Sequence, residues 1–268
     1  MDHFKYKKLD FQTAPAHWVM AKMGKTVLRP GGLQATDWLI ENGNITKKDI
    51  VEIAPGLGIT ASRLILKEPE SYAAVDQEAA AAETTIQRLH SLGYKNTDIT
   101  IGDAQNLPFD NESKDFIIGE AMLSMQPKNV KEKIFSEVYR VLKNNGQYCI
   151  HELVIEPKDI DPNIAAQIAK DLSQRIKVSV QFHTIDGWVA LLEAAGFKVI
   201  NYKILPMHLL EPKRLIQDEG LRGSLKFIFN VLTHKQARKR LLNLKKTFKK
   251  HNQHLNAIAI IAEKQTGE

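Results

Sequence analysis

The chain has 268 residues, 43% of them apolar, which suits one large α/β domain with insertions or a domain with a cap. Its one cysteine, Cys149, excludes a disulfide framework, and no apolar run approaches the roughly 18 residues of a membrane span. The formal net charge of +6 is uneven, because residues 211–254 hold twelve Lys and Arg against three Asp and Glu.

The N-terminal segment, residues 1–32, mixes lysines with aromatic and histidine side chains and ends in the turn Pro30-Gly31-Gly32. It has lysines but no apolar signal core, so we expect a cytoplasmic protein. The turn leads into a helix predicted over residues 33–42.

A glycine-bearing loop follows the first predicted strand, within residues 49–58, DIVEIAPGLG. A helix is predicted after it, and a second strand over residues 71–76 ends in Asp76. Glycine lets the backbone approach a ligand closely, and a carboxylate at the tip of the second strand can accept hydrogen bonds from a ribose diol. The unit therefore predicts a site for a nucleotide-like ligand at the carboxyl ends of parallel strands.

Two cofactor classes fit this loop. Residues 56–61 read G-x-G-x-x-A with Asp76 at the expected distance, the dinucleotide fingerprint of an NAD-dependent oxidoreductase. Residues 52–58 read E-x-A-x-G-x-G, which matches the first motif of class I S-adenosylmethionine (SAM) methyltransferases except that Ala54 replaces a glycine. The loop alone leaves both classes open.

Three segments further along decide between the two classes. They are residues 99–109 (ITIGDAQNLPF), 114–120 (KDFIIGE) and 137–146 (EVYRVLKNNG). In order and spacing they resemble segments of the methyltransferase type 11 group, which includes the ubiquinone/menaquinone-biosynthesis C-methyltransferases. The resemblance covers residues 30–200 approximately and favours the methyltransferase. Asn145 replaces a glycine of that pattern, a mild change because Asn tolerates a left-handed backbone.

Strands alternate with helices through the rest of the chain, which is typical of a doubly wound parallel sheet. Strands are predicted at 98–102, 115–120, 147–153, 197–205 and 255–262, with helices at 129–143, 161–177 and 184–195. The basic segment is expected to form two or three helices, 213–219, 221–233 and 235–252.

The resemblance implies a Rossmann-like, seven-stranded, mostly parallel sheet whose last strand is antiparallel, with a helical insertion between strands six and seven. It implies three parts. They are an N-terminal lid segment over residues 1–32, a SAM-binding core over 33–210 and 255–268, and a basic helical insertion over 211–254, the cap. His17 and Trp18 lie in the segment that the family folds over the pocket.

The resemblance also implies a role for each cofactor-binding residue. Glu52 would face the methionyl ammonium, Asp76 would take both ribose hydroxyls, and Asp103 would accept from the adenine amino group. The remaining expected contacts are Ala54, Pro55, Gly56, Gly58, Gln77, Ala104, Glu120 and Ala121. No metal is expected, because the histidines show no ligand spacing on one helix face.

Methyl transfer is an in-line displacement from an already activated sulfonium, so alignment and desolvation supply much of the rate. A general base is needed only if the acceptor loses a proton early. His151 and Glu152, at the end of the fifth strand, are the catalytic candidates, although adjacent strand residues point to opposite faces. The alternative for His151 is a buried, hydrogen-bonded histidine. The apolar residues 121–125 predict an apolar pocket wall and hence a small-molecule acceptor.

The basic insertion has three interpretations. As a cap over the acceptor site, it would bury Leu221, Leu225, Phe227, Ile228, Phe229, Val231 and Leu232 and turn its Lys and Arg outward. As a peripheral membrane contact, it would meet anionic lipid. Nucleic-acid binding is disfavoured because few aromatic residues accompany the charges. A SAM-binding protein without turnover also remains open, as do the atom that is methylated and the oligomeric state.

Overall fold

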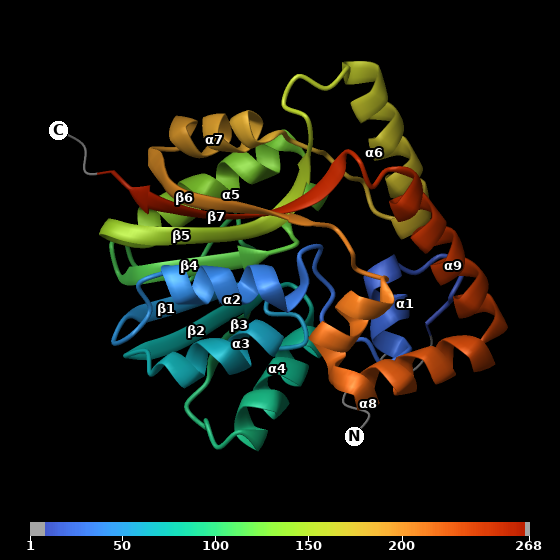
Figure 1. Ribbon diagram of the computed structural model, residues 1–268. Coiled ribbons are helices and arrows are strands. Elements are labelled where there is room, and N and C mark those ends of the chain that lie inside the picture. The colour runs from blue at the N-terminus through green and yellow to red at the C-terminus, as the bar shows by residue number, and fades with distance from the viewer. Residues whose placement is uncertain (1–8, 266–268) are drawn as a thin grey trace.

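A computed structural model describes residues 9–265, so the predicted lid can be followed from residue 9 and the predicted core up to residue 265. One sheet has the strand order β3-β2-β1-β4-β5-β7-β6 (Figure 1). Its strands are β1 Asp49–Ile53, β2 Ser71–Asp76, β3 Asp98–Ile101, β4 Lys114–Glu120, β5 Leu142–Ile155, β6 Phe197–Pro206 and β7 Leu255–Lys264.

All neighbouring strands from β3 to β5 pair in parallel, whereas β7 pairs antiparallel with both β5 and β6. This confirms the predicted fold class, a mostly parallel sheet with an antiparallel last strand. The strand order reverses between β1 and β4, and ligands of open α/β sheets bind at such a point, beyond the carboxyl ends of the strands.

Helices cover both faces of the sheet, which explains why the middle residues of the central strands are buried and mostly apolar. On one face α2 (Gly32–Asn42), α3 (Ile59–Leu64) and α4 (Ala79–Ser91) pack on β1, β2 and β4. On the other face lie α5 (Lys128–Val141) and α7 (Ile185–Ala194), whose Phe135 and Trp188 are fully buried.

Local signals in the sequence place several element ends correctly. Asp161 accepts from the backbone N–H of Asn163 at the start of α6 (Pro162–Ile176), and Thr184 accepts from Gly187 at the start of α7. Asn145 adopts a left-handed φ of 59°, as expected for an asparagine that replaces a glycine.

A third apolar cluster lies beyond the carboxyl edge of the sheet, on the right in Figure 1. It joins α1 (Ala16–Lys22), α6, α8 (Pro212–Thr233) and α9 (Lys235–Lys250). Helix α8 corresponds to two of the predicted helices joined by a kink at Gly220, where φ is 68°. The insertion therefore packs against the N-terminal segment and α6.

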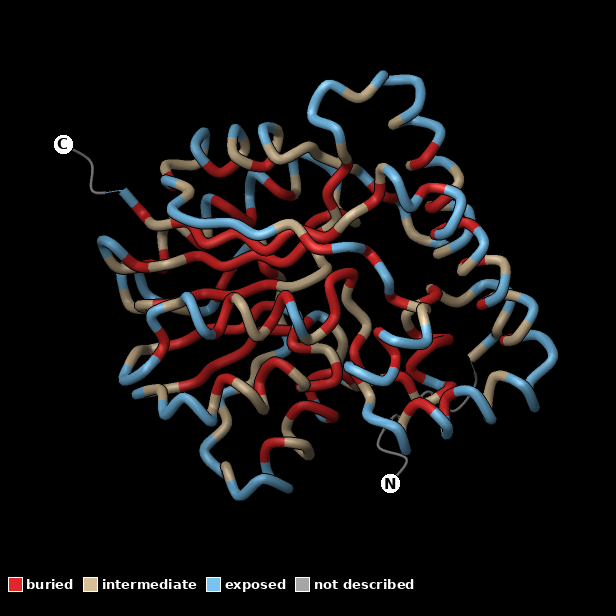
Figure 2. Tube along the Cα trace, viewed as in Figure 1, coloured by how far each residue is buried: buried red, intermediate tan, exposed pale blue. Residues whose placement is uncertain are grey.

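The inward packing expected of the insertion is wrong for most of its apolar residues. Phe227 is buried and Val231 partly buried, but five residues of α8 are exposed. They are Leu221, Leu225, Ile228, Phe229 and Leu232. Figure 2 shows exposed segments along this helix. Helix α8 carries apolar residues on more than one face, so composition alone could not tell which face would pack.

None of the helices within residues 9–265 is both long enough and apolar enough to cross a membrane.

Candidate active site

A cavity of about 380 Å³ lies at the carboxyl ends of β1, β2, β3 and β4. One half is lined by the polar loops that follow these strands. The other half is apolar and is lined by α1, α6, α9 and the segment after β6, through Ala16, Met20, Leu172, Ile176, Met207, Leu209, Leu244 and Phe248. One space therefore joins a polar site to an apolar site.

The loop after β1 is held in a left-handed conformation at Ala54, Gly56 and Gly58, with φ values of 56°, 60° and 69°. A Cβ at Gly56 would meet no atom nearer than the Ala54 carbonyl oxygen, 3.9 Å away, so the space in front of this backbone is open to a ligand. A Cβ at Gly58 would lie 3.0 Å from the Cα of Thr85. Gly58 thus allows α4 to pack closely, and it does not line the cavity.

Asp76 lies at the end of β2 beside this loop. Its Oδ2 accepts from the N–H of Gly56 (3.1 Å) and its Oδ1 from that of Glu78 (2.9 Å). Burial raises the pKa of Asp76, and these N–H groups oppose the shift. Each carboxylate oxygen keeps a lone pair, so a pair of ribose hydroxyls could still donate to it.

Most of the other residues expected from the sequence line the same cavity. Gln77, Asp103 and Ala104 line the cavity beyond β2 and β3, and the side chain of Asp103 is fixed by the N–H of Gln105 (2.9 Å). Ala54, Pro55, Glu120 and Ala121 also line it.

Glu52, in β1, is only 4% exposed and lines the cavity floor. Its Oε2 accepts from the Tyr72 hydroxyl (2.7 Å). Burial raises the pKa of Glu52 to about 8, so the side chain is largely protonated at neutral pH in the free protein. A cation beside it would stabilise the carboxylate instead.

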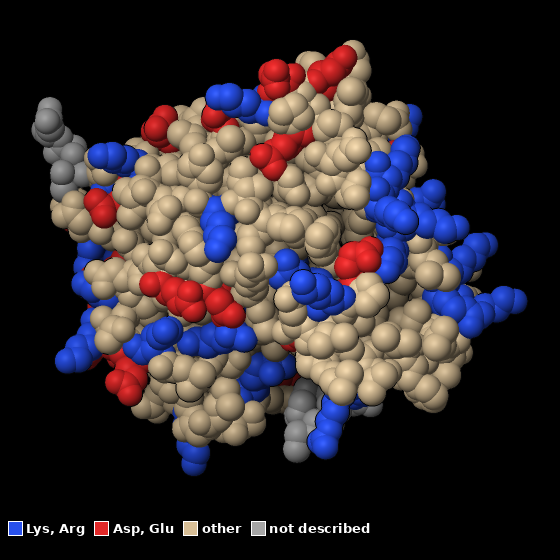
Figure 3. Space-filling model, in the orientation of Figure 1, with Lys and Arg blue, Asp and Glu red and all other residues tan. Residues whose placement is uncertain are grey.

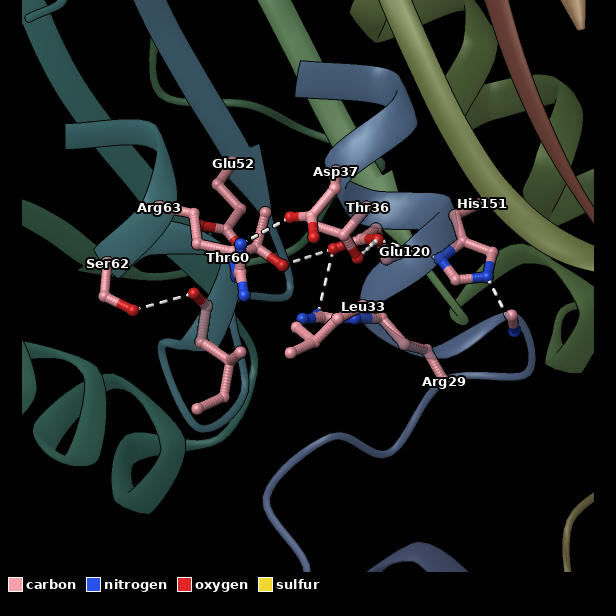
Figure 4. Close-up of polar contacts among 12 residues, drawn as sticks. Arg29, Leu33, Thr36, Asp37, Glu52, Thr60, Ser62, Arg63, Glu120 and His151 are labelled. Carbon is pink, nitrogen blue, oxygen red and sulfur yellow. Dashed lines mark hydrogen bonds and ion pairs between the residues drawn. The ribbon is translucent and has the colours of Figure 1, made fainter. Parts of the chain in front are cut away.

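Glu120 is the centre of a buried polar network at the end of β4 (Figure 4). Arg29 lies 2.9 Å from Oε2, Thr36 and Thr60 donate to the two oxygens, and His151 Nδ1 lies 2.8 Å from Oε1. Burial alone would raise the pKa of Glu120, but the charge of Arg29 and the His151 and Thr36 hydrogen bonds lower it to about 2. The network ties the N-terminal segment and α2 to the sheet.

His151 has both ring nitrogens engaged in this network. Its Nε2 accepts from the Gly31 N–H (2.9 Å), so Nδ1 carries the proton and donates to Glu120. The side chain is fully buried and does not line the cavity. This geometry favours the buried, hydrogen-bonded alternative for His151 over proton transfer.

Glu152 does line the cavity, but its carboxylate is occupied. It accepts from the backbone N–H groups of Met122 (2.8 Å), Leu123 (2.6 Å) and Ser124 (3.0 Å). Burial raises the pKa of Glu152 and these hydrogen bonds oppose the shift. The side chain thereby shapes the loop after β4, where the cavity turns from polar to apolar.

Arg29 is the residue that the motifs did not reveal. Its side chain lines the cavity, and its Nε and Nη2 are buried without a hydrogen-bond partner in the protein. Unpaired buried guanidinium donors beside an open cavity suit a carboxylate, which an Arg can bind through two parallel hydrogen bonds. Arg29 lies in none of the sequence motifs. Its partner Glu120 is on β4, far along the chain, so no local spacing indicates the contact.

We expect Asp76→Asn to weaken the binding of S-adenosylhomocysteine (SAH) about ten- to a hundredfold. Losing a charged acceptor typically costs about 1.5–3 kcal/mol, whereas the amide oxygen keeps one of the two backbone contacts. Calorimetric titration measures the affinity, and thermal unfolding checks the fold. Unchanged affinity in a folded variant would remove Asp76 from the ligand site.

Comparison with known proteins agrees with this geometry. Residues 50–146 match a family model described as a methyltransferase domain. An uncharacterized protein of Haemophilus influenzae is 34% identical over 92% of this chain and 97% of that protein. The phthiotriol/phenolphthiotriol dimycocerosates methyltransferase of Mycobacterium leprae is 33% identical over 49% of this chain, which spans 48% of that relative.

Among solved structures, phosphoethanolamine N-methyltransferase 2 of Haemonchus contortus, with phosphomonomethylethanolamine and SAH bound, superposes with a TM-score of 0.69. The alignment covers 97% of this chain and 61% of that one at 15% identity, so the likeness is one of fold.

Proposed function

Because the chain belongs to the class I SAM-dependent methyltransferases, we propose that it methylates a small molecule whose reacting end enters the apolar half of the cavity. The proposal rests on one observation, that the polar half and the apolar half of the cavity form one continuous space. The polar loops hold the groups that a nucleoside and an amino acid require, and the apolar wall begins directly beside them. An acceptor larger than a small molecule would have to displace the helices that enclose this wall.

SAM brings an activated methyl group on a sulfonium, and the cavity residues fit its parts. Glu52 would face the ammonium, Arg29 the carboxylate, Asp76 the ribose, and Asp103 with Ala104 the adenine. The unpaired donors of Arg29 and the open space before Gly56 support this fit. The roles of the individual residues are part of the proposal.

The chain's contribution to the chemistry is alignment and the exclusion of water. Glu152 fixes the loop that carries Met122 and Met125, and these thioethers with side chains of α6 and α9 form an apolar wall where the acceptor would lie. His17 also lines the cavity, and burial lowers its pKa to about 4, so its imidazole is neutral at neutral pH. A neutral imidazole can accept a hydrogen bond from a hydroxyl or amine of the acceptor.

Residues 9–32 and 211–254 would act together as lid and cap. Glu219 accepts from the N–H of Thr26 (2.9 Å) and of Val27 (2.9 Å), and Asp218 accepts from the N–H of Leu33 (2.9 Å). Lys25 is fully buried beside both carboxylates. Movement of one segment would therefore carry the other.

Mass spectrometry of a metabolite extract incubated with protein and deuteromethyl-SAM tests the function. We expect a small molecule to gain one deuteromethyl group with the protein and not with a Gly56→Val variant. Transfer only to macromolecules, or SAH binding without transfer to any fraction, would contradict the proposal.

We expect SAH binding at pH 7 to release about one proton per ligand. With a pKa of about 8, free Glu52 is mostly protonated, and an ammonium beside it would stabilise the ionised form. Calorimetry in buffers of different ionisation enthalpy measures the number of protons released.

The matched control for this measurement is Glu52→Gln, which keeps the shape and removes the titrating group. Proton release that persists in this variant, or its absence in the wild type, would show that Glu52 does not face the ligand's ammonium.

A further inference from the structure

An apolar stripe runs along the outer face of α8. Its side chains recur at helical spacing and so lie on one face: Leu221 (64% exposed), Leu225 (59%), Ile228 (43%), Phe229 (66%) and Leu232 (57%). Exposed apolar residues that occur singly are ordinary on protein surfaces, but a contiguous stripe marks an interaction site. We call these five residues the α8 stripe.

The rest of α8 fixes this orientation. Ser224 and Phe227 face inward and are buried, and Asn230 donates to the carbonyl of Met23 (2.9 Å). Just before the Gly220 kink, Asp218 and Glu219 accept hydrogen bonds from the backbone N–H groups of Leu33 and Thr26. The stripe cannot turn inward without breaking these contacts, so it is presented to solvent by a fixed helix.

The surroundings of the stripe are strongly basic. Residues 221–254 contain ten Lys and Arg and no Asp or Glu. Arg222 and Lys226 are exposed on α8 itself, and exposed lysines continue along α9. Figure 3 shows an uncharged surface over α8, bordered by Lys and Arg along α9. An apolar helix face beside a basic surface is the pattern that binds in the interface of an anionic membrane.

The same helices connect this surface with the cavity. Leu244 and Phe248 on the inner face of α9 line the apolar half, whereas Lys246 and Lys249 lie on its exposed side. Helix α9 therefore separates the apolar half of the cavity from the lysines of the basic surface.

We propose that the α8 stripe inserts into the interfacial region of an anionic bilayer while the lysines of α9 contact the lipid headgroups. The acceptor is then a small molecule dissolved in the membrane, which enters the apolar half of the cavity from that side. The docking surface stands on the exposure and charge described above; only the statement about the acceptor rests on the proposed function.

Vesicle flotation with the full chain tests the surface. Wild type should float with phosphatidylcholine vesicles containing phosphatidylglycerol and remain behind with phosphatidylcholine alone. Leu221→Ser, Leu225→Ser and Phe229→Ser combined should weaken vesicle binding roughly tenfold or more, since three apolar anchors are lost. A control replaces three exposed apolar residues elsewhere, Leu66→Ser, Leu92→Ser and Ile200→Ser, and should float like wild type.

A second pair of variants tests the charge. Lys239→Glu, Lys246→Glu and Lys249→Glu should abolish flotation at low salt, whereas Lys95→Glu, Lys133→Glu and Lys198→Glu, also exposed, should have little effect. SAH affinity should be unchanged in all four variants, which separates this proposal from the assignment of the cofactor site.

Any of four results would overturn the proposal. One is a wild type that floats with neither vesicle. Another is equal flotation of the stripe variant and its control. The third is a stripe that holds two copies of the chain together, seen as a wild-type dimer that the stripe variant converts to a monomer. The fourth is a wild type that binds RNA in a salt-sensitive way but does not float with vesicles, which would identify a nucleic acid, and not a membrane, as the partner of this surface.

Discussion

Gly56→Val should abolish SAH binding while leaving a folded protein. The space in front of Gly56 is open, since the nearest atom to an added Cβ is 3.9 Å away, and the ligand's methionyl part would fill that space. A branched side chain occupies it instead, so we expect the affinity to fall roughly a hundredfold or more. The left-handed φ of 60° adds a cost of about 1–2 kcal/mol in stability. Calorimetry and urea unfolding measure the two effects separately.

The matched control is Gly93→Val. Gly93 also has a left-handed φ, 86°, and an added Cβ there meets nothing within 4 Å, but it lies at the end of α4 outside the cavity lining. It should lose a similar amount of stability and keep full SAH affinity. If both variants bind SAH equally well, the loop after β1 does not cradle the ligand.

Arg29→Met should have the largest combined effect on stability and binding. The variant leaves Glu120 buried and ionised without its cationic partner, and breaking such a pair typically costs about 3–5 kcal/mol. Thr36, Thr60 and His151 still bond the carboxylate, so we expect a value near the lower end, about 3 kcal/mol. SAH affinity should fall at least roughly tenfold, because the unpaired donors of Arg29 are lost as well.

The pH dependence of this loss follows from the pKa of Glu120. A pKa of about 2 in the folded protein lies below the ordinary value of 4.5, so the ionised carboxylate stabilises the fold above pH 4.5 and this contribution is lost as the pH falls towards 2. The difference between wild type and Arg29→Met in the free energy of unfolding should therefore shrink below pH 4.5. Urea unfolding at pH 7 and at about pH 3.5 measures it.

Arg63→Met is the control for the ion pair. Arg63 pairs with Asp37 nearby, but both side chains are more than a third exposed. Such pairs contribute about 1 kcal/mol or less. If Arg29→Met and Arg63→Met destabilise the protein equally, Glu120 is not the centre of a buried network that depends on Arg29.

The sequence predicted the sheet and the polar half of the cavity because their signals are local. The loop after β1, Asp76 at the end of β2 and Asp103 just after β3 all lie at strand ends, and parallel strands bring their carboxyl ends to one edge. The caps Asp161 and Thr184 are local signals too.

Contacts between distant elements could not be predicted in this way. Glu120, Arg29 and His151 meet because β4, β5 and the N-terminal segment converge, and no spacing in the chain records that contact. Likewise the apolar residues of α8 occupy two sides of the helix, and only the partners of Ser224, Phe227 and Asn230 decide which side faces inward.

Calorimetric titration of the wild type with SAH tests the central statement most directly, namely that the cavity at the carboxyl ends of β1–β4 holds SAM. We expect saturable binding of one SAH per chain, release of about one proton at pH 7, and no binding of NADH under the same conditions. Binding of NADH, with no heat of binding detected for SAH, would contradict this assignment. It would show that the glycine loop binds a dinucleotide.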